Sequence, residues 1–155
     1  MQDNLKIISH SPEQTMTIGR EVGKIAFRGC IIALCGELGS GKTVFVKGLA
    51  EGLEVDSFIT SPTFVLINEY SGKYPLYHFD VYRLRAEDMY ELGYEEYFYG
   101  DGVTAIEWAQ KISNLLPEEY LRVDFEYVSE SERLISLTGY GADYVNLIKN
   151  LGKFC

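Results

Sequence analysis

Eight consecutive residues carry the clearest chemistry in this chain. They match the phosphate-binding pattern G-x-x-x-x-G-K-[ST] and are Gly36, Glu37, Leu38, Gly39, Ser40, Gly41, Lys42 and Thr43. The glycines let the backbone turn tightly and direct successive N–H groups at one anion. Lys42 supplies a mobile cation for the β- and γ-phosphates of a nucleotide, and the Thr43 hydroxyl is a hard oxygen ligand of the kind that Mg²⁺ prefers. The pattern predicts a phosphate-binding loop (P-loop) for a nucleotide, with ATP favoured.

The elements on either side of this loop suit that chemistry. An apolar run from Cys30 to Cys35 predicts a buried strand before it, and apolar residues at helical spacing predict a helix after it that ends near Gly52. The N-terminus of that helix adds a partial positive charge for a phosphate. The guanine-reading sequence Asn-Lys-x-Asp does not occur in the chain, which favours adenine.

Two carboxylates follow apolar strand runs and are candidates to act with the metal. Asp80 ends the run from Leu76, and Glu107 ends the run from Val103. Since a sheet delivers side chains to its carboxyl edge, we expect both near the nucleotide, one holding Mg²⁺ and the other positioning the attacking water. The alternative is that one of them is a strand-end cap or ion-pair partner.

Two further motifs have both a functional and a structural interpretation. Trp108 is the single tryptophan and directly follows Glu107, so it is either a core anchor or a contact in the site. The hydroxyl-rich stretch Ser61, Pro62 and Thr63 either senses the γ-phosphate, as switch loops do, or forms an ordinary turn.

The remaining patterns predict one α/β domain over residues 1–155. It is of the P-loop NTPase type, with a mixed central sheet, helices on both faces and a C-terminal antiparallel hairpin. Further strands are predicted at residues 5–9, 63–70, 74–80, 103–108, 121–127 and 133–138. Further helices are predicted from the Ser11 cap to about residue 28, at 87–92, after Trp108 to about residue 115, and at 142–151.

Composition narrows the classes of function. Apolar residues make up 46% and charged residues 24%, as in an ordinary globular protein. The net charge of −9 disfavours direct binding to nucleic acid, so any tRNA would be held through partner subunits. Cys30 and Cys35 face opposite sides of a strand, and His10 and His78 have no neighbours at ligand spacing, which argues against a Cys/His metal site. With no signal-like or membrane-spanning run, we expect a cytoplasmic protein.

Taken in order, five motifs resemble the TsaE family, the bacterial ATPases of tRNA threonylcarbamoyladenosine biosynthesis. They are the P-loop, Ser61-Pro62-Thr63-Phe64, the run from His78 to Leu84, Glu91-Leu92-Gly93 with Glu96-Tyr97-Phe98, and Ile106-Glu107-Trp108. The resemblance implies a P-loop fold that binds ATP and Mg²⁺. It also implies a weak ATPase that acts with TsaD and TsaB, where TsaD modifies adenosine 37 of tRNAs reading codons that start with A.

The resemblance also implies roles for individual residues. Lys42 would bind phosphates, Thr43 and Glu107 would bind Mg²⁺, and Asp80 would support hydrolysis. Residues 61–63 would form a switch-like loop, and Ser11 and Arg133 would contact the nucleotide outside the P-loop.

Two other classes of function remain open. A small-molecule kinase also uses a P-loop but needs an arginine-rich lid, and Arg83 with Arg85 is the closest arginine pair in the chain. A nucleotide-gated binding module would hydrolyse ATP incidentally. The segment between Arg85 and Lys111 has no basic residue and carries several acidic and aromatic ones, which suits either a protein interface or a solvated acidic helix with inward rings.

Overall fold

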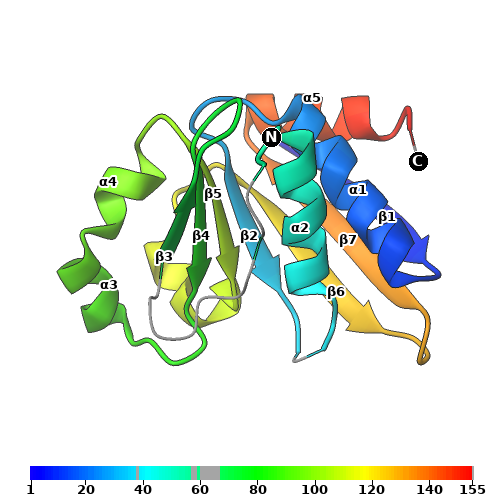
Figure 1. Ribbon diagram of the computed structural model, residues 1–155, viewed down its shortest axis with the longest axis horizontal. Helices are drawn as coiled ribbons and strands as arrows, with labels where there is room; N and C mark the ends of the chain where they lie inside the picture. Colours follow the sequence, from blue (N-terminus) through cyan, green and yellow to red (C-terminus); the bar gives the residue numbers. More distant parts are fainter. Residues whose placement is uncertain (38, 57–58, 60–66, 155) are drawn as a thin grey trace.

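The computed structural model describes residues 1–37, 39–56, 59 and 67–154 (Figure 1). In these residues one sheet has the strand order β1-β7-β6-β2-β5-β4-β3. The strands are β1 (Gln2–Ser9), β2 (Ile31–Cys35), β3 (Ile67–Tyr70), β4 (Leu76–Asp80), β5 (Val103–Glu107), β6 (Tyr120–Tyr127) and β7 (Arg133–Tyr140).

The middle of the sheet is parallel and its two sides are antiparallel. Strands β6, β2, β5 and β4 pair in parallel, whereas β7 and β1 on one side and β3 on the other run against their neighbours. The predicted mixed sheet and the antiparallel hairpin β6–β7 are therefore confirmed. The carboxyl ends of β2, β4 and β5 meet at one edge, where ligands bind in α/β folds.

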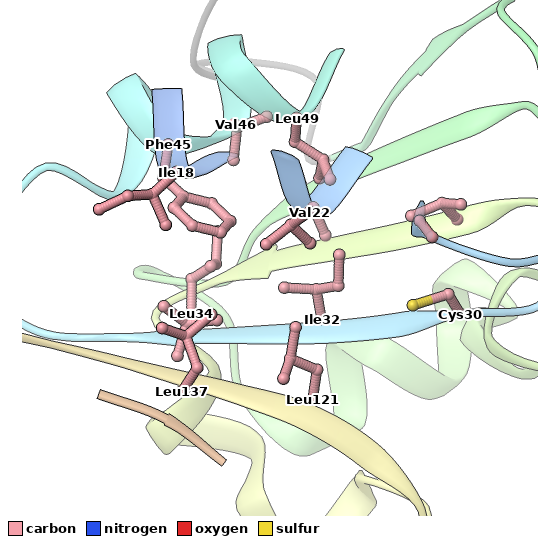
Figure 2. Close-up of a cluster of buried hydrophobic side chains, with 14 of the residues drawn as sticks. Ile18, Val22, Cys30, Ile32, Leu34, Phe45, Val46, Leu49, Leu121 and Leu137 are labelled. Atoms are coloured by element: carbon pink, nitrogen blue, oxygen red, sulfur yellow. The ribbon is translucent and has the colours of Figure 1, made fainter. Parts of the chain in front are cut away.

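Helices cover both faces of the sheet, as predicted. The first face carries α1 (Pro12–Ile25), α2 (Lys42–Gly52) and α5 (Ala142–Leu151), and the second carries α3 (Ala86–Leu92), α4 (Tyr94–Phe98) and the 3₁₀ helix η1 (Ala109–Leu115). Alternate residues of β2 divide between the two cores, since Ile32 and Leu34 enter the first and Ile31 and Ala33 the second. Figure 2 shows side chains of α1 and α2 over Ile32 and Leu34. Cys30 and Cys35 also fall in opposite cores.

Helices α1 and α2 pack with their backbones in close approach. A Cβ atom at Gly19 of α1 would collide with the carbonyl oxygen of Phe45, and one at Gly48 of α2 would collide with that of Met16. Glycine is therefore required at both positions if the helices keep this separation. The contact ties the helix that follows the P-loop to the helix that Ser11 caps.

Several element boundaries differ from the sequence predictions. Helix α1 begins as predicted, with the Gln14 N–H donating to Ser11 Oγ at 3.1 Å, but it ends at Ile25 rather than near residue 28. The segment after Trp108 is a 3₁₀ helix kinked at Ile112, whose side chain turns fully into the second core. Helix α4 was not predicted, because Gly93, at φ 67°, ends α3 and at once starts another turn.

Strand ends also differ by a few residues. The first strand begins at Gln2 rather than at residue 5, and β7 continues to Tyr140 rather than ending at residue 138, because the two strands pair along their whole length. The first four residues of the strand predicted at 63–70 lie outside the described residues. Strand β6 shows the predicted alternating burial, but it pairs in parallel with β2 as well as antiparallel with β7.

Candidate nucleotide site

The P-loop connects the carboxyl end of β2 to the first turn of α2 (Figure 1). Gly39 and Gly41 have φ of 74° and 107°, backbone conformations that side chains other than glycine rarely adopt. Helix α2 begins at Lys42 with no side-chain cap. Residues 42–44 of its first turn line the cavity that the loop borders, and a helix N-terminus at such a cavity can bind an anion.

Lys42 is buried, and its ammonium group is bound by the loop itself. Nζ donates to the carbonyl oxygens of Gly36 at 2.6 Å and Glu37 at 2.8 Å, and to Ser40 Oγ at 3.3 Å. Burial lowers the pKa of Lys42, while the nearby carboxylates of Glu107 and Asp80 act in the opposite direction. The ammonium group is thus held against the backbone of the P-loop itself.

Strand pairing brings the two predicted carboxylates together, because Asp80 and Glu107 are register partners at the ends of β4 and β5. Thr43 Oγ1 donates to both oxygens of Glu107, at 2.9 and 3.1 Å. Asp80 accepts the N–H of Tyr82 at 3.0 Å. Burial raises the pKa of Asp80, and the charge of Glu107 raises it further.

These groups border one open cavity of about 270 Å³. It is lined by residues 39–44 together with Asp80, Glu107 and Trp108. The hydroxyl and carboxylate oxygens of Thr43 and Glu107 are ligands that suit Mg²⁺. Among the described residues no group of three His, Cys, Asp or Glu side chains could hold a metal ion. A magnesium ion here would therefore complete its shell with water and phosphate oxygens, as Mg²⁺ does in nucleotide sites.

A second, smaller cavity of about 120 Å³ lies beside the loop, and Ser11 and Arg133 both line it. The guanidinium of Arg133 donates to the carbonyl oxygen of Gly39 at 3.2 Å and lies 4.9 Å from the ring centre of Tyr127. The fold thus brings these two distant residues to the P-loop.

Trp108 has features of both interpretations. It belongs to the second core and is 9% exposed. Its ring centre also lies 4.0 Å from Lys42 Nζ and 4.7 Å from the ring centre of Tyr82. The residue adopts φ 64°, a left-handed conformation that is rare for a bulky side chain and that often marks functional sites. Trp108 therefore packs in the core and contacts Lys42 at the same time.

A larger open depression of about 650 Å³ lies away from the P-loop, near the start of β2 and the residues that follow η1. Its lining includes Glu118 and Glu119 and contains no lysine or arginine. Such a surface repels phosphates, so its size does not make it the nucleotide site.

Sequence reasoning missed His78, which is completely buried next to Glu107 with Nε2 2.5 Å from Oε2. The signal was its position two residues before Asp80, since alternate residues of a strand share a face. Leu38, Ser61, Pro62, Thr63 and Cys155 lie outside the described residues. No helix among the described residues is long and apolar enough to cross a membrane.

Fold and loop together have the form of a P-loop nucleotide-binding protein. The family model described as "Threonylcarbamoyl adenosine biosynthesis protein TsaE" matches residues 9–135, and the chain belongs to the TsaE family. The Bacillus subtilis (strain 168) "tRNA threonylcarbamoyladenosine biosynthesis protein TsaE" is 42% identical over 150 residues, 96% of this chain and 94% of the relative. The Treponema pallidum (strain Nichols) protein is 40% identical over 134 residues, 86% of this chain and 99% of the relative.

A solved structure agrees with these sequence relationships. The crystal structure of Bacillus subtilis YdiB superposes with a TM-score of 0.82 at 39% sequence identity, covering 99% of this chain and 97% of that one. The similarity therefore extends over almost the whole fold.

Proposed function

We propose that this chain is a Mg²⁺-dependent ATPase, one domain over residues 1–155, that serves threonylcarbamoyladenosine modification of tRNA in the cytoplasm. One observation carries the proposal: Lys42, Thr43, Asp80 and Glu107 converge on a single cavity at the P-loop. Family membership supports the pathway, because the curated relatives are named tRNA threonylcarbamoyladenosine biosynthesis proteins.

Each side chain has a task that its surroundings support. Lys42 exchanges the carbonyl groups of Gly36 and Glu37 for the β- and γ-phosphates. Thr43 and Glu107 hold Mg²⁺, which when bound neutralises charge that develops on the phosphates. Asp80 orients the attacking water, and its raised pKa makes it a stronger proton acceptor than an ordinary aspartate.

Ser11 and Arg133 bind the nucleoside part in the smaller cavity beside the loop. Both line that cavity, and Arg133 is already hydrogen-bonded to the P-loop through Gly39. To residues 61–63, which lie outside the described residues, the proposal assigns the γ-phosphate-sensing role of the family pattern. The absence of the guanine-reading sequence Asn-Lys-x-Asp favours ATP over GTP.

Hydrolysis is weak in the isolated chain and is completed in a complex with TsaD and TsaB, which modifies adenosine 37 of tRNAs reading codons that start with A. The net charge of −9 supports contact with tRNA through these partners rather than directly, because nucleic-acid binding normally needs a basic surface.

Phosphate release from ATP tests the proposal. It should be measured with the chain alone, with TsaD and TsaB added, and with a panel of metabolite acceptors. We expect stimulation by the two proteins and no phosphate on any acceptor. Transfer of phosphate to an acceptor, with no response to the proteins, would identify a small-molecule kinase instead.

A further inference from the structure

A buried histidine outside the P-loop lies against the carboxylate assigned to the metal. His78 is in the middle of β4 and is 0% exposed, and its Nε2 lies 2.5 Å from Oε2 of Glu107, which is itself 3% exposed. A buried polar contact this short fixes both side chains, because neither can turn to water for another partner.

The protons of this pair can be placed by counting hydrogen-bond partners. No partner for Nδ1 is found in the part of the chain that the structure describes. A proton on Nδ1 would bury an N–H donor without an acceptor, and it would face the lone pair of Nε2 toward the carboxylate. A proton on Nε2 lets the ring donate to Glu107, and Nδ1 is then an acceptor with no donor among the described residues.

Donors from two different elements therefore hold the Glu107 carboxylate. His78 of β4 donates to Oε2, and Thr43 of α2 donates to both oxygens. Thr43 is itself a proposed metal ligand, and its hydroxyl can face Mg²⁺ with a lone pair while its proton stays on Glu107. His78 has no part in binding the ion, so its hydrogen bond serves only to fix the carboxylate. Side chains that hold a metal ligand in this way commonly change metal affinity or activity ten- to hundredfold when removed.

We propose that His78 is a positioning residue that presents Glu107 to Mg²⁺ through a hydrogen bond from Nε2. It touches neither nucleotide nor metal and acts through the carboxylate alone. The inference rests on the proposed function, since it assumes that Mg²⁺ and a nucleotide bind at this site.

A matched pair of variants tests the proposal. His78→Gln keeps an N–H donor at about the reach of Nε2, whereas His78→Asn is shorter and withdraws it. The affinity for a non-hydrolysable ATP analogue would be titrated in EDTA and over a series of Mg²⁺ concentrations. Calorimetry and the fluorescence of Trp108, the single tryptophan, which follows Glu107 directly, would report binding.

We expect wild type and His78→Gln to respond to Mg²⁺ at the same concentration. The midpoint for His78→Asn should rise about tenfold, with the affinity in EDTA unchanged in all three proteins. His78→Phe, which keeps a ring but has no donor, should behave as His78→Asn does and serves in its place if that variant does not unfold cooperatively.

Three results would overturn the inference. They are a wild-type Mg²⁺ midpoint in folded His78→Asn or His78→Phe, an equal loss of affinity in EDTA, and failure of both of these variants to fold. The last two would mark a residue that only maintains the structure. Absence of any nucleotide binding by the wild-type chain is a different result, and it would remove the proposed function itself.

Discussion

The two faces of the sheet are built in different ways. Among the described residues, the first face has three helices of 14, 11 and 10 residues, and α1 and α2 contact each other backbone to backbone through glycines. The second face has three helices of 7, 5 and 7 residues. There, rings pack edge to face, as Phe79 does with Phe98 and Tyr94 does with Phe98.

The first face positions the residues of the site, whereas the second face mainly covers the core. Backbone contact between α1 and α2 leaves little freedom in the position of the P-loop and of Ser11. Asp80 and Glu107 belong to strands whose alternate residues fill the first core, so their side chains lie on the side of α2. Trp108 is the point where the second core reaches the site, through its ring contact with Lys42.

The acidic segment between Arg85 and Lys111 forms part of the exterior of the second face, and its rings point in more than one direction. Tyr94 and Phe98 are buried, which supports inward-packed rings, but Tyr90 and Tyr99 are 60% and 65% exposed. The acidic helices therefore turn some of their aromatic residues to the core and leave others at the surface.

The largest expected effect comes from separating α1 and α2. Gly48→Ala should lower the free energy of unfolding by about 3 kcal/mol, because the added Cβ collides with the backbone of Met16. Denaturant unfolding measures it. Gly152→Ala is the control, since its Cβ would meet only atoms at 3.6 Å, and it should change stability little. Equal stability of Gly48→Ala and wild type would show that the helix contact is not tight.

Replacement of Lys42, the cation proposed to bind the phosphates, should cost nearly as much free energy as Gly48→Ala. The loss should fall on ATP binding rather than on stability. Lys42→Ala should weaken ATP binding about a hundredfold, or about 2.7 kcal/mol, since one buried charge-assisted contact is lost. Lys47→Ala changes a lysine of the same helix and should bind ATP normally. Titration calorimetry compares the two. Similar affinity in both variants would move the phosphate site away from Lys42.

A smaller effect, with opposite signs for stability and turnover, is expected at Asp80. Asp80→Asn should slow hydrolysis and stabilise the fold at pH 7, because burial raises the pKa of Asp80 and the ionised carboxylate therefore destabilises the folded state. The hydrogen bond from the Tyr82 N–H and the charge of Lys42 partly offset this rise in the pKa of Asp80, and the charge of Glu107 adds to it.

The gain in stability from Asp80→Asn should depend on pH. A raised pKa means that the folded chain binds the proton more tightly, so wild-type stability falls as pH rises from the ordinary value of 3.8 to the raised one. The advantage of Asp80→Asn should therefore shrink as the pH is lowered through this window. Thermal unfolding at several pH values measures it. A stability difference that grows toward acid would contradict the assignment.

The smallest effect is expected on the exposed part of the second face. Tyr99→Ser should change the free energy of unfolding by less than about 0.5 kcal/mol and leave ATP affinity unchanged, because the side chain is largely in solvent and the site belongs to the first face. Fluorescence titration of the variant is sufficient. Weakened nucleotide binding would show that the two faces are coupled.

Local patterns predicted much of this architecture. The P-loop motif, the apolar run before it and the Ser11 cap each depend on neighbouring residues, and the structure has a strand, loop and helix there. Asp80 and Glu107 could both be expected at the carboxyl edge of the sheet, because each ends an apolar strand run. Helix α4 could not be predicted, because a glycine such as Gly93 normally marks the end of a helix and here also begins the next one.

The features that could not be predicted from the sequence depend on contacts between residues far apart in the chain. In the sequence, His78 has no neighbour at the spacing of metal ligands. Its contact with Glu107 arises only because β4 and β5 pair in register. The placement of Ser11 beside Arg133 likewise depends on how α1 and the β6–β7 hairpin meet the P-loop. Such proximity follows from the order of strands in the sheet, which local periodicity does not encode.

The proposed nucleotide site can be tested by calorimetric titration of the wild-type chain with ATP and with GTP, both in the presence of Mg²⁺. We expect one saturable site per chain, with a higher affinity for ATP than for GTP. Absence of saturable heat with either nucleotide would rule out this site.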